Sequence, residues 1–329
     1  MAGGVSSVQL VSAVSCAGGI GSFGFAYSPP ELIKESLASV DGLPNRAVNA
    51  NFFVFEDVET PTFEQTSLAL RALEALPKRG SSFKVPQAPY FPSLEAQIAP
   101  VWEHPPEIIT FHFGIPDKSI LEKAKCHGIF VGVTATNVTE ALAIQDAGAD
   151  FIVAQGYEAG GHRGMFKAKT STDEKLNAMD LLAAIHGNCS IPIVSAGGIM
   201  TGGDIRRYLN KGAVAAQMGT AFLVCHEAGS SAEHKRFLLV EHDRKTVLTK
   251  AFSGRPARSI ETTFTKLMSK KPVLPFPIQN TLTAKLRADA VRGGNGEYQS
   301  LWAGTGFTKS RSLTAAELVE TLAIEAELN

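Results

Sequence analysis

Apolar segments of strand length alternate with segments of helical periodicity through residues 1–224. Strands are predicted at residues 20–25, 47–55, 108–113, 129–135 and 151–154, and from about residues 191 and 214. Between them, helices are predicted at residues 6–17, 30–40, 63–76, 94–102 and 137–147. Repeated βα units of this length predict a parallel sheet, and their number predicts an α/β fold of the (β/α)8 TIM-barrel type.

One strand of such a barrel is missing from the pattern. The first predicted helix begins at Ser6, and Met1-Ala-Gly-Gly opens the chain without a strand. A closed eight-stranded barrel needs a full strand at this place, because an unclosed sheet exposes a free edge. We therefore expect the chain to start inside the first βα loop, with the first barrel strand cut off, misannotated or replaced.

The pattern changes after residue 224. Residues 225–300 contain polar helical stretches and a proline-rich break at residues 272–277, which predicts a helical substrate or lid lobe after strand 8. Thr314 and Glu317 have the spacing of a capping box, so a last helix is predicted from about residue 314. The expected units are a barrel at 1–224, a lobe at 225–300 and a segment at 301–329 that returns to the barrel.

Composition and charge exclude several classes of protein. The formal net charge of −1 gives no electrostatic basis for binding nucleic acid or a membrane surface, and no run reaches the roughly 18 apolar residues that a membrane span needs. The four cysteines are scattered and the start of the chain has no signal-peptide pattern, which predicts reduced thiols in a cytoplasmic protein. His226, His234 and His242 recur at a spacing unlike that of metal ligands, so they are predicted to face solvent and no metal site is expected.

Glycine-rich turns follow the last two predicted barrel strands. In eight-stranded barrels these loops commonly hold phosphate, because glycine lets backbone N–H groups approach an anion closely. Glycines that only form tight turns are the alternative for a single loop, and the pair of loops favours phosphate. The candidate residues are Ser195, Gly197, Gly198, Gln217, Met218, Gly219 and Thr220.

Polar residues at the ends of other strands are candidates for chemistry. His162 follows the strand at residues 151–154 within a glycine-rich turn and has the ordinary pKa of a general base, although an exposed loop histidine is the alternative. His112 ends another strand and is expected to line the pocket. Asn49 and Asn51 share one strand face, and the sequence alone does not decide which of them would contact a bound ligand.

At this point the sequence resembles the nitronate monooxygenases, formerly called 2-nitropropane dioxygenases. The resemblance covers nearly the whole chain in the right order and is most specific in the segment Ala154-Gln-Gly-Tyr-Glu-Ala-Gly-Gly-His-Arg-Gly164. Further similar segments are Ala17-Gly-Gly-Ile-Gly-Ser-Phe-Gly24, Asn51-Phe-Phe-Val, Phe111-His-Phe-Gly-Ile-Pro116, Ser195-Ala-Gly-Gly-Ile199, Gln217-Met-Gly-Thr-Ala-Phe222, Ala251-Phe-Ser-Gly-Arg-Pro-Ala-Arg258 and Gln299-Ser-Leu-Trp-Ala-Gly304.

The resemblance implies site residues. His162 would be the active-site base, and the flavin contacts would be Met1, Ala2, Gly3, Asn51, Gln155, Gly160, Ser195, Gly197, Gly198 and residues 217–220. Thr305 stands where that family usually has glutamine, which implies an altered fit of substrate. Tyr298 and Lys309 flank it and are expected, with His112, to line the substrate pocket.

The resemblance also implies an activity. It is the FMN-dependent oxidation by dioxygen of alkyl nitronates, with propionate 3-nitronate as a toxic target, to a carbonyl compound and nitrite. Two alternatives stay open: a flavin-dependent enoyl-acyl-carrier-protein reductase and a non-catalytic FMN-binding protein. The reductases generally have Ala-Glu-Gly where this chain has Ala154-Gln-Gly, and they lack the Ser-Leu-Trp-Ala-Gly segment. The sequence leaves the oligomeric state open.

Overall fold

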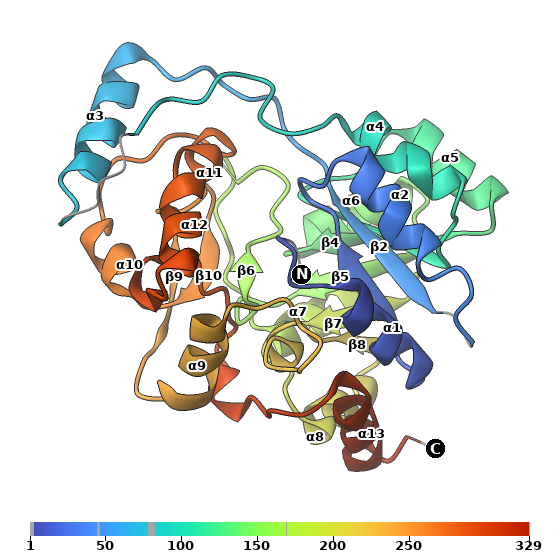
Figure 1. Ribbon diagram of the computed structural model, residues 1–329. Helices are drawn as coiled ribbons and strands as arrows, with labels where there is room; N and C mark the ends of the chain where they lie inside the picture. The colour runs from blue at the N-terminus through green and yellow to red at the C-terminus, as the bar shows by residue number, and fades with distance from the viewer. Residues whose placement is uncertain (1–2, 45–46, 78–82, 169, 329) are drawn as a thin grey trace.

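A curled parallel sheet forms the main body of the protein (Figure 1). The computed structural model describes residues 3–44, 47–77, 83–168 and 170–328. In order of pairing, its strands are β1 (Gly21–Gly24), β2 (Val48–Phe53), β3 (Ile108–His112), β4 (Phe130–Ala135), β5 (Phe151–Gln155), β7 (Ile193–Ala196) and β8 (Ala215–Gln217). The seven strands predicted from the apolar segments are thereby confirmed, and so is the TIM-barrel class, with the first strand missing.

Helices follow the strands and cover the outside of the sheet. They are α1 (Val8–Cys16), α2 (Pro30–Ala38), α4 (Leu94–Ile98), η1 (Ala99–Trp102), α5 (Lys118–Cys126), α6 (Val138–Asp146), α7 (Ala178–His186), α8 (Gly202–Leu209) and α13 (Ala315–Ala326). The predicted capping box is present, because the Thr314 hydroxyl accepts from the Glu317 backbone N–H and the Glu317 carboxylate accepts from the Thr314 N–H. Helix α13 packs against α8 and α1, so the end of the chain returns to the barrel.

The sheet is open between β1 and β8. These two strands end the order of pairing, and no strand of the described residues pairs with their free edges. Ile20 and Val214, which directly precede the two strands, are more than half exposed, at 51% and 60%. A closed barrel would bury both, so the opening is where an eighth strand of the predicted fold would lie.

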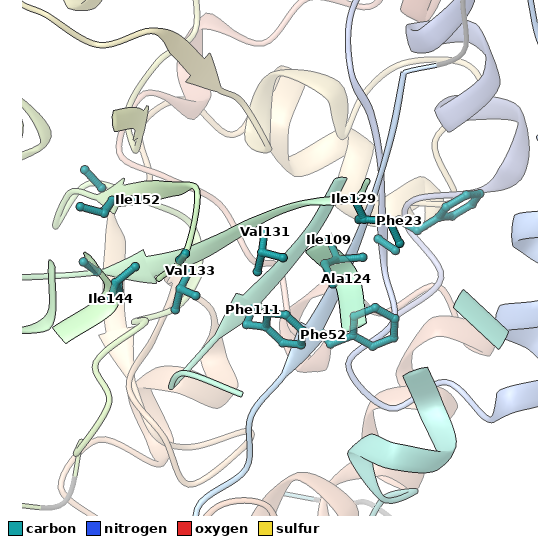
Figure 2. Packing of buried hydrophobic residues seen from close by; sticks show 14 of the residues in the cluster. Phe23, Phe52, Ile109, Phe111, Ala124, Ile129, Val131, Val133, Ile144 and Ile152 are labelled. Carbon is teal, nitrogen blue, oxygen red and sulfur yellow. The ribbon is translucent and has the colours of Figure 1, made fainter. Parts of the chain in front are cut away.

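Successive side chains along each strand divide the sheet into two faces. Phe23, Phe52 and Phe111 point outward and are buried under the covering helices with the apolar residues of β4 and β5 (Figure 2). The residues next to them in sequence point to the inside of the curled sheet, where Ser22 and Thr110 line a cavity. Because the side-chain period of a strand is two, one apolar core and one polar interior come from the same short segments.

A lobe packs beside the barrel and contains both helices and strands. Its elements are α3 (Phe63–Glu74), β6 (Gly161–His162), α9 (Ala232–Val240), β9 (Thr246–Thr249), β10 (Ala257–Ile260), α10 (Thr263–Leu267), α11 (Ile278–Leu282) and α12 (Ala284–Arg292). Three short 3₁₀ turns complete this part of the chain: η2 (Thr220–Phe222), η3 (Gly296–Tyr298) and η4 (Phe307–Lys309). The predicted helical lobe after strand 8 also contains strands, because β9 and β10 pair antiparallel there and β10 also pairs with β6. These strands of two to four residues have too few positions to show an alternating pattern.

The lobe takes one helix from the first part of the chain. Ala69 and Leu73 of α3 are buried with Phe252 and Phe264, which come after the barrel strands. Figure 1 shows α3 beside α10–α12 and away from α2. The lobe core therefore contains residues from before and after most of the barrel strands. The expected boundary at residue 224 does not describe this, because it assigns α3 to the barrel.

The longest helices described, α3 and α13, have 12 residues each. In the described part of the chain, none combines the length and apolar character needed to cross a bilayer.

The outer-face core predicts a clear difference between two phenylalanine substitutions. We expect Phe52→Ala, at a position that is 0% exposed, to lower the free energy of unfolding by about 3–5 kcal/mol. Phe63→Ala is the matched control, because that ring is 88% exposed at the start of α3 and its loss should change stability by less than about 0.5 kcal/mol. The shift of the urea unfolding midpoint measures both, and equal shifts would contradict this description of the core.

Candidate active site

A cavity of about 740 Å³ lies at the carboxyl ends of the barrel strands. Asn51, Thr134 and Gln155 line it from the sheet, and His234 and Arg287 line it from helices α9 and α12 of the lobe. This is the end of a TIM barrel where active sites lie, and the volume is within the usual range for cofactor and small-molecule sites.

His162 lies in the wall of this cavity, on strand β6. Its backbone pairs with Ala257 of β10, and its Nε2 lies 2.8 Å from the Ser253 hydroxyl. The ring centroids of Phe276 and Trp302 are 5.6 and 5.4 Å from the imidazole centroid. Strand pairing, a hydrogen bond and aromatic packing therefore hold His162 in place, and the alternative of an exposed loop histidine does not describe it.

Two further side chains hold the backbone of the histidine turn. The His162 carbonyl accepts hydrogen bonds from Gln155 Nε2 at 3.0 Å and from His112 Nε2 at 3.2 Å. Gln155 Oε1 accepts from the Gly164 N–H at 2.7 Å, so both ends of this amide bind the turn. Because a carbonyl can only accept, the proton of His112 is on Nε2 in this arrangement.

Both imidazoles are neutral at pH 7. Burial lowers the pKa of His162 to about 3, and His112 and Arg255 add to the effect. Burial likewise lowers the pKa of His112 to about 3, with the positive charge of Arg255 as the next cause. The physical reason is that the charged imidazolium loses its hydration among the aromatic rings of this wall and lies near a guanidinium.

The two asparagines of β2 both line the cavity but differ in their bonding. Asn49 donates to Ser22 Oγ at 2.8 Å and exchanges hydrogen bonds with Thr110 Oγ1, so its amide is occupied at both ends. Asn51 donates to Thr110, and its Oδ1 has no hydrogen-bond partner among the described residues. Asn51 also lies nearer the carboxyl end of the strand. The geometry therefore favours Asn51 over Asn49 for contact with a bound molecule.

The glycine loops meet at the same cavity. Gly197 and Gly198 have φ values of +113° and +71°, which side chains rarely adopt, and both line the cavity with residues 217–220. At Gly160 an added Cβ would lie 2.6 Å from the backbone of Ala303 and Gly304. The close approach of these backbones makes glycine necessary at Gly160 and brings residues 303–304 to the histidine turn.

Several predicted site residues do not line the cavity. Ser195 points to the covering helices, because its neighbour Ala196 lines the cavity and adjacent strand residues face opposite ways. Tyr298 is buried in the lobe core against Phe264, Thr305 is exposed, and Lys309 is exposed with its Nζ 4.0 Å from Asp204. Gly3 lines the cavity, whereas Met1 and Ala2 are outside the described residues.

The structure adds residues that sequence reasoning missed. The Ser253 hydroxyl contacts His162 across 91 positions in the chain. Tyr27 lines the cavity from the loop that follows β1, and Arg287 lines it from α12. His234 was predicted to face solvent, but it is 6% exposed and lines the cavity, since it is on the buried face of α9 with Phe237 and Leu238. The segment containing Ser253 was recognised as a motif, whereas nothing in the sequence pattern points to Arg287.

The acidic, thiol and imidazole side chains are dispersed in the part of the chain that the structure describes. No group of three or more His, Cys, Asp or Glu side chains is arranged there to hold an ion. The polar groups around the cavity are amides, hydroxyls, neutral imidazoles and guanidinium groups, which suit an organic cofactor or an anion.

A TIM-barrel fold with a histidine and two glycine loops at the carboxyl ends of its strands defines an α/β-barrel enzyme. The family model for nitronate monooxygenase matches residues 1–325. The chain belongs to the nitronate monooxygenase family and is an oxidoreductase.

Relatives and solved structures agree with this assignment. The chain is 35% identical over 326 residues to a nitronate monooxygenase of Paraburkholderia phytofirmans, covering 97% of this chain and 88% of the relative. Its fold is similar to a nitroalkane oxidase from Streptomyces ansochromogenes, with a TM-score of 0.91, 35% identity, and coverage of 99% and 94%. FabK from Thermotoga maritima, at 21% identity and a TM-score of 0.73 with coverage of 99% and 91%, shows the shared fold alone.

The lowered pKa values predict that both histidines of the cavity wall stay neutral in mild acid. In NMR titrations from pH 8 to pH 5, the imidazole signals of His112 and His162 should not shift, because burial keeps both pKa values near 3. His112→Asn and His162→Asn assign the two sets of signals. A titration midpoint near the ordinary histidine value for either residue would contradict the buried, neutral site.

Proposed function

We propose that the protein oxidises alkyl nitronates with dioxygen, using FMN, to a carbonyl compound and nitrite. The observation that carries the proposal is the fixed, neutral His162 in the wall of a cavity that is also lined by glycine loops of the kind that bind phosphate. Membership of the nitronate monooxygenase family supports the substrate class. Propionate 3-nitronate is the proposed physiological substrate, and its removal by detoxification is the proposed role.

The residues of the cavity fit FMN. The loops at residues 197–198 and 217–220 would hold its phosphate, and Asn51 Oδ1 would accept a hydrogen bond from its ring system. Ser230 Oγ and His234 Nε2 also line the cavity, buried and without a partner among the described residues, so they favour a polar ligand there. When bound, FMN supplies the redox chemistry between nitronate and dioxygen.

His162 is proposed to handle the proton of the substrate. The single proton of the Ser253 hydroxyl is directed to the Arg255 carbonyl at 3.1 Å, so the proton in the contact between Ser253 and His162 is on His162 Nε2. Nδ1 is then the basic nitrogen. A neutral imidazole can remove the α-proton of a nitroalkane or donate a hydrogen bond to a nitronate, and the lowered pKa favours this neutral form.

The arrangement of Gln155 favours this function over the enoyl-acyl-carrier-protein reductase alternative. Its Nε2 donates to the His162 carbonyl while its Oε1 accepts from the Gly164 N–H. An ionised glutamate at this position would keep the second bond and lose the first, because a carboxylate has no donor. The turn of this chain is therefore built around an amide.

Oxygen consumption is the direct test of the proposed function. Purified protein should bind FMN and consume dioxygen when propionate 3-nitronate is added, with nitrite formed. NADH should not bleach the bound flavin rapidly under anaerobic conditions, because rapid bleaching is expected of the reductase. Bound flavin with neither reaction would instead favour a non-catalytic FMN-binding protein.

Substitution of His162 should separate two kinds of substrate. We expect His162→Asn to lower kcat/KM for neutral nitroethane by about 100-fold or more, since general-base catalysis contributes about 10²–10⁴-fold. The loss with ethyl nitronate, which needs no deprotonation, should be below about tenfold. His242→Asn, at an exposed position, is the matched control and should change neither rate. Equal losses on both substrates would refute the role of His162 as a base.

The proposed setting is the reducing cytoplasm. Cys16, Cys126, Cys189 and Cys225 are all free thiols, which fits such a compartment. Burial, the larger of two causes, raises the pKa of the Cys225 thiol to about 12, so this cysteine is unreactive.

A further inference from the structure

Arg287 is a cationic group in the cavity that the proposed chemistry does not use. It lies on α12, and both of its hydrogen bonds to described residues come from Nη2, which donates to the Asn280 carbonyl at 2.7 Å and to Asn280 Oδ1 at 3.0 Å. Its Nε is buried and has no partner among the described residues. Within that part of the chain no carboxylate forms an ion pair with it. Arg287 is half-buried, and a guanidinium that loses hydration without an anion beside it is costly, so the site favours an anionic ligand.

Tyr27 is a second donor at the same corner of the cavity. Its hydroxyl is buried and has no hydrogen-bond partner among the described residues, and the residue lines the cavity. Burial raises the pKa of this phenol, and the positive charge of Arg287 opposes the shift without cancelling it. Tyr27 is therefore a neutral O–H donor next to a cation. The Tyr27 hydroxyl and the Arg287 Nε are thus two donors without acceptors among the described residues, and a carboxylate can accept hydrogen bonds from both.

The corner is close to His162. The Tyr27 ring centroid lies 5.8 Å from that of Phe53, which in turn lies 6.2 Å from the imidazole of His162. Phe276 makes a second such connection, at 6.5 Å from Tyr27 and 5.6 Å from His162. One aromatic ring thus lies between Tyr27 and His162 along each of these two paths, and the positive charge of Arg287 is one of the causes that lower the pKa of His162.

A purely structural role does not account for the whole guanidinium. Its contact with Asn280 connects α12 to α11 but uses only one of the three nitrogens. The glycine loops after β7 and β8 already supply a phosphate site in the proposed function, so FMN phosphate does not require Arg287. The remaining donors have the planar geometry that matches a carboxylate.

We propose that Arg287 and Tyr27 form a carboxylate-binding subsite, which makes the enzyme selective for nitronates that carry a carboxylate at the other end of a short chain. This inference rests on the proposed function and names the group that the cavity recognises besides the nitronate.

A pair of matched substrates tests the subsite. Propionate 3-nitronate and propyl 1-nitronate differ in having a carboxylate or a methyl group at the far end. In Arg287→Met, the ratio of their kcat/KM values should fall by about 10- to 100-fold, mainly through the KM for propionate 3-nitronate, since a hydrogen-bonded charge is lost. Tyr27→Phe should lower the ratio less, and Arg287→Lys should retain part of it.

Arg292→Met is the matched control, because Arg292 is on the same helix, its side chain is 71% exposed, and it pairs with Asp289. It should leave the ratio unchanged. A ratio within about twofold of wild type in Arg287→Met, or equal losses on both substrates in protein that retains its flavin, would overturn the subsite. If Arg287→Met does not fold, the ratio in Arg287→Lys and Tyr27→Phe decides in the same way.

Binding of propionate distinguishes failure of the subsite from failure of the proposed function. Calorimetry should show that the wild-type holoenzyme binds propionate and that Arg287→Met binds it at least about tenfold more weakly. If Arg287→Met binds propionate more weakly but the wild-type protein oxidises neither nitronate, the proposed function is refuted and the subsite is supported. Oxidation of nitronates with equal propionate binding by both proteins would refute the subsite alone.

Discussion

The two-residue period of the barrel strands is the constraint on which the rest of the structure depends. On β2 it sends Phe52 into the apolar core and Asn51 into the cavity, so stability and chemistry are encoded at neighbouring positions. A register shift of one residue would bury amides among the helices and place phenylalanine in the cavity. The helices that cover the outer face therefore determine, by burying one set of side chains, which polar groups face a ligand.

The second constraint is that His162 belongs to two parts of the fold. Strand β6 leaves the barrel after β5 but pairs with β10 of the lobe, and its imidazole contacts Ser253. The carbonyl of the same residue is held from the barrel side by Gln155 and His112. Because donors from the barrel and a strand from the lobe hold one residue, displacement of the lobe would move the imidazole. The lobe is thus a structural component of the site as well as its cover.

The sequence predicted those features that depend on local order along the chain. Seven strands, the capping box at Thr314 and the glycine loops all follow from neighbouring residues. Ser195 was predicted to contact a cofactor, whereas the period of the strand, applied from Ala196, turns its side chain away from the cavity. Tyr27 and Arg287 could not be found, because their proximity results from a helix of the lobe packing over the barrel, 260 positions further along the chain. Long-range packing of this kind leaves no periodic signal in the sequence.

Electrostatics connects these features to the choice of substrate. The imidazoles in the cavity wall are neutral because aromatic burial removes their hydration, while Arg255 and Arg287 keep their charge, since even a lowered guanidinium pKa stays well above neutrality. Arg255 lies over the Phe113 ring at 3.9 Å, which partly replaces its lost hydration. The two guanidinium groups therefore place positive charge near His162 at neutral pH without any charge on the histidine itself. An anion is attracted there by the guanidinium groups, and His162 remains free to exchange a proton. Once bound, such an anion would raise the pKa of His162, because it stabilises the imidazolium, so binding itself would make the imidazole a stronger base.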